Sequence, residues 1–222
     1  MQRVLEPEVM DTWEESIAYD AMDFTEVNAA FAERAIALGP STGLVLDAGT
    51  GPARIPILIG QQRPEWQIIG IDLSRNMLQV GEQNVQQAGL QEQIHLEWVD
   101  AKQLPYPAAH FDLVVSNSLI HHLPDPLPFL QELKRVLKPQ GGILLRDLLR
   151  PADEATVDAL VDRIGPEYDA HQQQLFRDSL CAAFSLDELA DLLEQAGLED
   201  ALLYQSSDLH WTAERPWRDR PS

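Results

Sequence analysis

A glycine turn between two short apolar runs constrains this chain more than any other feature. Leu44 to Leu46 precedes Asp47, and Gly49 and Gly51 follow within five residues of the run's end. Such a run is typical of a buried parallel strand that leads into a tight turn. Glycine accepts positive φ angles and allows a ligand to approach the backbone. The sequence therefore predicts a ligand-binding turn at the end of a buried strand.

The next apolar run ends in an acid at the position where a ribose would bind. Gln67 to Ile71 is predicted as the second strand, and Asp72 follows it directly. Asp72 lies about 20 residues beyond the turn, the spacing at which an acid accepts hydrogen bonds from the hydroxyls of a ribose. The two features together predict a ligand of the adenosine type.

The residues of the turn distinguish between two kinds of adenosine ligand. A dinucleotide fingerprint needs a further glycine at position 54, so that a pyrophosphate can sit on the helix N-terminus, and this chain has Arg54. Asp47 is unfavourable beside a pyrophosphate but suits a ligand with an ammonium and a sulfonium. A dehydrogenase is therefore disfavoured. The pattern Asp-x-Gly-x-Gly resembles the S-adenosylmethionine (SAM) site of class I methyltransferases.

The resemblance covers residues 42–148 and is to the broad family called methyltransferase domain 11. Its motifs are Val45 to Arg54, Ile69 to Met77, Val99 to Ala101, Phe111 to Asn117, Leu119 to Leu123 and Arg135 to Gly142. One position departs from the family, because Ala53 replaces a usual third glycine and follows Pro52. Proline is well tolerated in the first turn of a helix, so we expect the turn to persist with slightly less room for the methionine moiety.

Alternating strand and helix patterns predict an α/β fold with a mostly parallel sheet covered on both faces. The resemblance implies a Rossmann-like three-layer sandwich with seven strands, of which the last is antiparallel. We expect strands near 44–48, 67–71, 94–98, 111–116, 142–148, 202–206 and 209–213, and core helices near 53–61, 74–88 and 126–138.

We expect a single SAM-dependent methyltransferase domain over residues 1–222, because this length and 45% hydrophobic residues suffice for one buried core. Its parts are a helical N-terminal decoration (1–40), the cofactor-binding core (42–148), a helical cap insertion (151–184), and the last helix and strands (185–215). Helical periodicity covers 8–38, and short helices are predicted over 153–164 and 167–179. Ser185 and Glu188 form a capping box for the returning helix over 185–196. In the resembling family, insertions at this place often cover the acceptor pocket.

The resemblance implies a cofactor role for particular residues. Asp47 would help to fix the turn and the methionine ammonium, Asp72 the ribose, and Asp100 the adenine amino group, with the Ala101 amide donating to the ring. Met77 would pack on the adenine and is equally a candidate core residue. The predicted cofactor-binding set is Tyr19, Asp47, Gly49, Thr50, Gly51, Asp72, Leu73, Met77, Asp100, Ala101, Asn117 and Ser118.

Two adjacent histidines are the candidates for a general base. Methyl transfer is an in-line displacement that needs positioning and, for a protonated acceptor, a base, and imidazole titrates near neutral pH. His121 is the predicted catalytic residue, with a structural or cofactor-adjacent role as the alternative. The predicted acceptor pocket comprises His122, Arg146, Tyr168 and His171. Arg146 would bind a substrate carboxylate or form an ion pair within the protein, for instance with Asp147.

No metal is expected from the sequence, because no histidine and carboxylate cluster has ligand spacing on one helix face. The two adjacent histidines are expected to point in different directions. Metal-dependent methyl transfer is therefore not predicted.

The formal net charge of −20 disfavours nucleic acid as a partner, because a phosphate backbone would be repelled. No apolar run approaches the roughly 20 residues that span a bilayer, and no charged and apolar leader stands at the N-terminus. We therefore expect a soluble cytoplasmic protein with no membrane partner.

The predicted function is transfer of a methyl group from SAM to an O or N atom of a small molecule, with S-adenosylhomocysteine (SAH) as product. The alternatives are a protein methyltransferase and a non-catalytic domain that binds SAM or SAH. An aminopropyltransferase is disfavoured, because that family has a run of glycines and an extra acid in the first turn. The acceptor and the oligomeric state are not predicted.

Overall fold

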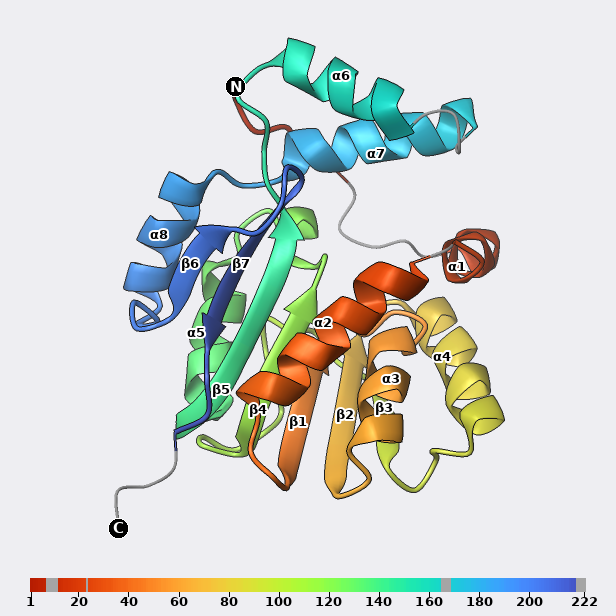
Figure 1. Cartoon of the computed structure of the whole chain (residues 1–222), viewed down its shortest axis with the longest axis vertical. Helices are drawn as coiled ribbons and strands as arrows, with labels where there is room; N and C mark the ends of the chain where they lie inside the picture. The colour runs from red at the N-terminus through yellow and green to blue at the C-terminus, as the bar shows by residue number, and fades with distance from the viewer. Residues whose placement is uncertain (7–11, 23, 165–168, 219–222) are drawn as a thin grey trace.

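A seven-stranded sheet forms the centre of the computed structural model, with the strand order β3-β2-β1-β4-β5-β7-β6 (Figure 1). The structure describes residues 1–6, 12–22, 24–164 and 169–218. Four strand pairs are parallel, and β7 is antiparallel to both of its neighbours. The predicted α/β class, the seven strands and the antiparallel last strand are thereby confirmed. The strands are β1 (Gly43–Ala48), β2 (Trp66–Asp72), β3 (Ile94–Trp98), β4 (Phe111–Asn117), β5 (Leu137–Leu148), β6 (Leu202–Gln205) and β7 (His210–Arg215).

The strand order reverses at β1, and this reversal positions the site. The chain runs from β1 outward to β2 and β3 and then returns to place β4 on the other side of β1. In open α/β sheets, ligands bind beyond the carboxyl ends of the strands at such a switch point. Asp47 lies there, in register with Gly70 of β2 and Val115 of β4.

Helices cover both faces of the sheet because the strands alternate their apolar side chains between two core clusters. Val45 and Leu144 face the cluster under α2 and α3. Leu46 and Leu145 face the cluster under α5 and α8. The helices are α1 (Trp13–Asp20), α2 (Thr25–Leu38), α3 (Arg54–Gln62), α4 (Arg75–Ala88), the 3-10 helix η1 (Ile120–His122), α5 (Leu127–Val136), α6 (Glu154–Ile164), α7 (Ala170–Ala182) and α8 (Leu186–Gln195).

The predicted insertion after β5 is present as a helical pair. Figure 1 shows α6 and α7 beyond the carboxyl end of β5, and α7 contacts η1. The pair has its own small apolar cluster, which includes Leu148, Val157 and Leu180. The predicted capping box of Ser185 and Glu188 begins α8. The division of residues 1–222 into four parts of one domain stays a prediction.

Two predicted boundaries are wrong. The expected helix over 126–138 ends at Val136, and β5 begins at Leu137 rather than near 142. Pro139 disfavours helical backbone at the residue before it, and Leu137 pairs with Phe111 across a register shift in the sheet. The helical periodicity predicted over 8–38 corresponds to α1 and α2; residues 7–11 and 23 lie outside the described part of the chain.

Among the helices that the structure describes, none combines the length and apolarity needed to cross a membrane.

Candidate functional site

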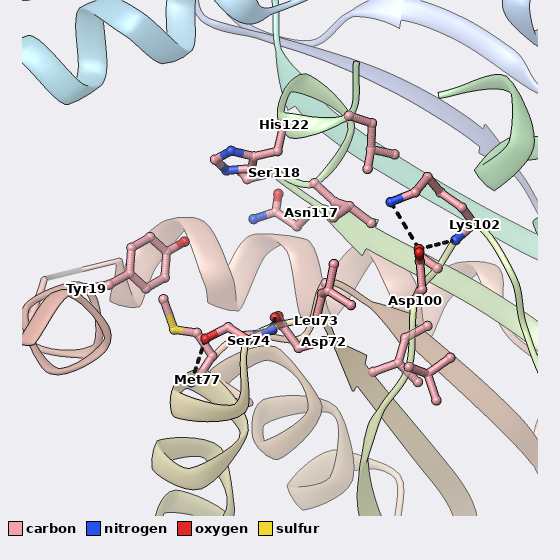
Figure 2. Close-up of a pocket in the computed structure, with 17 residues that line it drawn as sticks. Tyr19, Asp72, Leu73, Ser74, Met77, Asp100, Lys102, Asn117, Ser118 and His122 are labelled. Carbon is pink, nitrogen blue, oxygen red and sulfur yellow. Dashed lines mark hydrogen bonds and ion pairs between the residues drawn. The ribbon is translucent and has the colours of Figure 1, made fainter. Parts of the chain in front are cut away.

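An open cavity of about 780 Å³ lies at the carboxyl ends of β1 to β4 (Figure 2). We call it the main cavity. All predicted cofactor-binding residues except Asp47 and Thr50 line it, and so does His122. The lining residues are Tyr19, Gly49, Gly51, Ile71, Asp72, Leu73, Ser74, Met77, Val99, Asp100, Ala101, Lys102, Asn117, Ser118, Leu119, His122 and Leu123.

The glycine turn is fixed by the end of β2. The amides of Gly49 and Thr50 both donate to the carbonyl oxygen of Ile71, each at 2.9 Å. Gly49 and Gly51 have φ angles of 74° and 52°, which glycine adopts without steric strain. Ala53 also has a positive φ, 60°, at the start of α3. The turn persists with alanine at this position, and its conformation explains why glycine is usual there in the resembling family.

Substitution of Gly49 by alanine is expected to destabilise the protein more than the same change at Gly89. Both glycines have a positive φ, but a Cβ at Gly49 would meet the Leu119 side chain at 3.0 Å, whereas a Cβ at Gly89 has no atom within 4 Å. Overpacking adds about 1 to 3 kcal/mol to the backbone strain that the two variants share. Thermal unfolding of both variants measures this difference, and equal losses of stability would contradict the expected contact.

Asp72 connects the glycine turn to the start of α4. Its Oδ2 accepts from the Gly51 amide at 2.9 Å, and its Oδ1 accepts from the Ser74 amide at 2.8 Å. Burial raises the pKa of the Asp72 carboxyl, and these backbone hydrogen bonds offset that effect only in part. Each carboxylate oxygen can accept a second hydrogen bond. Asp72 can therefore hold the turn and still bind hydroxyl groups in the main cavity.

Asp47 lies behind the turn rather than in the cavity wall. Its side chain is buried, and Oδ2 has no hydrogen-bond partner among the described residues; the same is true of Thr50 Oγ1. Burial, together with the negative charge of Asp72, raises the pKa of Asp47 to about 7. A buried carboxylate oxygen without a partner is costly. This arrangement fits a ligand that carries a positive charge next to the turn.

Asp100 and Met77 lie at opposite sides of the main cavity, as Figure 2 shows. Asp100 Oδ1 accepts from the Lys102 amide at 2.9 Å and also pairs with the Lys102 ammonium at 3.1 Å. Met77 belongs to α4, which begins at the Ser74 cap, and its side chain is largely buried. The sulfur-containing side chain thus serves both the core and the cavity wall.

Helix α1 is fastened over the cavity by an ion pair that the sequence analysis missed. The Arg54 guanidinium donates to both carboxylate oxygens of Asp20, each at 2.7 Å, and Asn84 Nδ2 donates to Oδ1 at 3.1 Å. Tyr19 precedes Asp20 and lines the cavity. No residue near Arg54 in the sequence indicates a pair with an acid in α1. Arg54 therefore served in the sequence only as evidence against a dinucleotide.

The variant Arg54→Gln is expected to weaken SAH binding modestly, about 3- to 10-fold, because it releases α1 and Tyr19 from the cavity rim. Arg54 is half exposed, so the pair contributes only about 1 kcal/mol. Arg163→Gln is the matched control, since its pair with Asp208 is exposed and involves no residue of the cavity. Calorimetric titration with SAH compares the two variants. Identical affinities for SAH would show that the ion pair between Arg54 and Asp20 does not contribute to binding.

A second cavity of about 1380 Å³ adjoins the first, and we call it the side cavity. It lies between the α1–α2 segment and α3, and it shares four residues with the main cavity, namely Tyr19, Gly49, Gly51 and Asn117. Thr50 lines it. Its other lining residues are Asp20, Ala21, Met22, Phe24, Thr25, Asn28, Pro52, Arg54, Ile55, Ile57, Leu58 and Gln61. Apart from the residues of the glycine-turn motif up to Arg54, no motif marks the lining of the side cavity, so this cavity was not predicted.

The two histidines occupy different positions. His121 is buried and lines neither cavity, whereas His122 lines the main cavity. His121 Nδ1 is 2.5 Å from Asp147 Oδ1, and the His121 amide donates to Asp147 Oδ2 at 3.0 Å. Burial alone would lower the pKa of His121, but the Asp147 carboxylate outweighs it and the pKa is raised. An imidazole that is enclosed and paired with a buried carboxylate is poorly placed to accept a proton from a substrate.

The expectation that the two imidazoles point in different directions is wrong. Their ring centroids are 4.0 Å apart with an interplanar angle of 35°. Glu6 Oε1 lies 3.2 Å from His121 Nε2 and 2.9 Å from His122 Nδ1. Glu6 is far from the pair in the sequence, which is why no spacing rule could find this cluster.

Of the other predicted acceptor residues, Arg146 is the one whose side chain the structure describes. Arg146 lines neither cavity. It lies opposite Thr212 of β7, which in turn lies opposite Tyr204 of β6. Burial lowers the pKa of the Arg146 guanidinium. Its buried Nε has no partner among the described residues. Tyr168 lies outside the described residues, and His171 is in α7 with a side chain outside them. Asp147 pairs with His121, so the alternative of an Arg146 to Asp147 pair is not what the structure shows.

The sheet order, the glycine turn and the acid at the end of β2 define the fold of a class I SAM-dependent methyltransferase. A family model described as a methyltransferase domain matches residues 41–197, and the chain belongs to this family.

Relatives of known activity are similar over part of their length. The chain is 30% identical over 155 residues to 27-O-demethylrifamycin SV methyltransferase of Amycolatopsis mediterranei, which covers 70% of this chain and 53% of that protein. It is 36% identical over 108 residues to a demethylmenaquinone methyltransferase of Listeria monocytogenes, over 48% of this chain and 45% of the relative. The chain thus spans about half the length of the curated relatives it matches.

The fold is also that of a solved structure, phosphoethanolamine N-methyltransferase 2 of Haemonchus contortus, in complex with phosphomonomethylethanolamine and SAH. The TM-score is 0.66 at 21% identity, over 88% of this chain and 44% of that chain.

Proposed function

We propose that this protein transfers a methyl group from SAM to an O or N atom of a small-molecule acceptor. The observation that carries the proposal is the sequence of three acids at the ends of neighbouring strands. Asp47 stands at the end of β1, Asp72 ends β2, and Asp100 follows β3. An ammonium, a ribose and an adenine amino group need acceptors in this order along one ligand. A dinucleotide would instead need a pyrophosphate beside Asp47, where like charges repel.

The chain's own residues would hold SAM along the main cavity. Asp47 acts on the ammonium through its buried negative charge, and Asp72 accepts from the ribose hydroxyls. Asp100 and the Ala101 amide bind the adenine edge, while Leu73 and Met77 contact its face. When bound, SAM supplies an electrophilic methyl group on a sulfonium. The remaining predicted cofactor residues, Tyr19, Gly49, Thr50, Gly51, Asn117 and Ser118, would enclose the methionine end.

The side cavity is the proposed route for the acceptor. It meets the main cavity at Tyr19, Gly49, Gly51 and Asn117, which are the residues proposed to lie around the methyl-bearing end of SAM. An in-line displacement needs the acceptor atom on the side of the methyl group opposite the sulfur. Relatives named for a rifamycin and a menaquinone precursor support a small-molecule acceptor for this route.

We assign the role of general base to His122 rather than to His121. His121 is enclosed between Asp147 and Glu6, so we assign it a positioning role for His122, which lines the main cavity. The net charge of −20 supports a small molecule rather than a nucleic acid as the partner. We also propose a cytoplasmic location without a membrane partner.

Incubation with methyl-labelled SAM and a panel of phenols, hydroquinones and amines tests the proposed activity. We expect one chemical class to become labelled, with one SAH formed per methyl group transferred. The Asp72→Ala variant should lose this transfer. Tight SAH binding by the wild type without transfer to any acceptor would instead favour a non-catalytic SAH-binding domain, and transfer to added proteins would favour a protein methyltransferase.

A further inference from the structure

Three side chains that could bind one cation converge at the wall of the main cavity. Glu6, His121 and His122 each present a ligand atom, and these atoms lie within 4.8 Å of one another. The N-terminal segment reaches this place because the Arg3 guanidinium donates to the carbonyl oxygens of His121 and Leu123, at 2.9 and 2.8 Å. The cluster therefore joins residues from two distant parts of the chain.

The ligand atoms of the cluster lie in a largely buried place and face one another at ion-pair distance. The Glu6 side chain is 8% exposed. Its Oε2 accepts from the Ser179 hydroxyl at 3.0 Å, but Oε1 has no hydrogen-bond partner among the described residues, and neither has His122 Nδ1. These two atoms are only 2.9 Å apart, the distance of an ion pair when the imidazole is protonated, although their geometry is not that of a hydrogen bond. A buried acceptor oxygen without a partner is costly, and a cation between the atoms would satisfy both.

The distances fit one small ion. Glu6 Oε1 is 3.2 Å from His121 Nε2 and 2.9 Å from His122 Nδ1. Two ligands at about 2.0 to 2.1 Å from a tetrahedral zinc ion lie about 3.3 Å from each other. Small shifts of the side chains would thus place an ion at bonding distance from all three atoms.

The surroundings of His121 also fit a metal ligand. Its Nδ1 is held 2.5 Å from Asp147 Oδ1, which directs Nε2 toward Glu6. Histidines that bind metals usually donate their other ring N–H to a carboxylate in this way, and the carboxylate fixes the ring and its tautomer.

We propose that Glu6, His121 and His122 bind one divalent transition-metal ion, for which zinc is the best fit. Two imidazoles and one carboxylate favour zinc over magnesium or calcium, which prefer oxygen ligands alone. Three protein ligands leave a fourth position open. Because His122 lines the main cavity, water or an acceptor oxygen could take that position. This proposal departs from the expectation that the chain binds no metal, and it does not depend on the proposed methyl transfer.

Calorimetric titration of the chelator-stripped full chain with zinc chloride tests this site. We expect one zinc per chain, and we expect Glu6→Gln and His122→Asn each to weaken binding about 100-fold or more, since loss of a supporting carboxylate alone typically weakens binding 10- to 100-fold. Glu65→Gln and His95→Asn are the matched controls, because both side chains are exposed and outside the cluster; these variants should bind zinc as the wild type does. Cobalt in place of zinc should give the visible absorption of a tetrahedral ion, which both cluster variants lose.

Circular dichroism and SAH titration of each variant separate a lost ligand from a lost fold. A folded Glu6→Gln protein that fails to bind zinc supports the site, whether or not SAH binds. The proposal is overturned if the wild type binds no zinc, or if the cluster variants bind it as tightly as the controls. In either case Glu6 is a partner of the two imidazoles within the protein and not a metal ligand.

Discussion

Replacement of Asp72 by alanine is expected to weaken SAH binding about 10- to 100-fold. Loss of hydrogen bonds to a charged carboxylate corresponds to about 1.5 to 3 kcal/mol. The variant also loses the acceptors for the Gly51 and Ser74 amides, so the turn and the start of α4 should loosen. Because those amides are left without partners, we expect the free energy of unfolding to fall by about 1 to 3 kcal/mol as well.

Asp125→Ala is the control for Asp72→Ala. Asp125 also accepts from a backbone amide, that of Leu127, but it lies on the surface outside both cavities. Calorimetric titration with SAH and thermal unfolding of both variants compare the two positions. We expect only the Asp72 variant to lose affinity. A variant that is less stable but binds SAH normally would show that Asp72 only supports the turn.

Replacement of Asp47 by asparagine is expected to have opposite effects on stability and on binding. Burial raises the pKa of Asp47 from 3.8 to about 7, so the ionised carboxylate destabilises the folded protein above that pH. A shift of this size corresponds to roughly 4 kcal/mol at most. The neutral amide removes this penalty, so the ligand-free variant should be more stable at about pH 8, by about 2 to 4 kcal/mol. SAH binding should weaken about 10-fold or more, because the ammonium loses its counter-charge.

The stability difference between Asp47→Asn and the wild type should depend on pH. The Asp47 carboxyl binds a proton more tightly in the folded state than in the unfolded state, so its contribution to stability falls as the pH rises from about 4 to about 7. The gap in stability between Asp47→Asn and the wild type should therefore widen between about pH 5.5 and about pH 8. Thermal unfolding at both pH values measures it. A gap that stays constant with pH would show that Asp47 is not the group that titrates.

The fold and most of the cavity wall could be predicted because their signals are local. Strand and helix periods identify the elements, and Asp72 and Asp100 lie at or just after the ends of neighbouring strands, so the parallel order brings them to one edge. Position 53 could be flagged because the resembling family usually has glycine there, and its φ of 60° supplies the physical reason.

The rest of the site depends on contacts between distant segments. Nothing near Arg54 indicates its pair with Asp20, and nothing near Glu6 indicates that it meets two histidines. The prediction of His121 as the base followed from an ordinary imidazole pKa, whereas its burial beside Asp147 sets its actual environment. Such environments are created by packing, and packing partners are not written in a local pattern.

The most direct test of this account is calorimetric titration of the wild-type protein with SAH and, separately, with NAD. We expect SAH to bind at one site per chain with a dissociation constant in the micromolar range or below. We expect no binding of NAD, because the negative charge of Asp47 repels a pyrophosphate and position 54 lacks the glycine of a dinucleotide turn. Binding of NAD by a folded protein that ignores SAH would contradict the assignment of the main cavity to SAM.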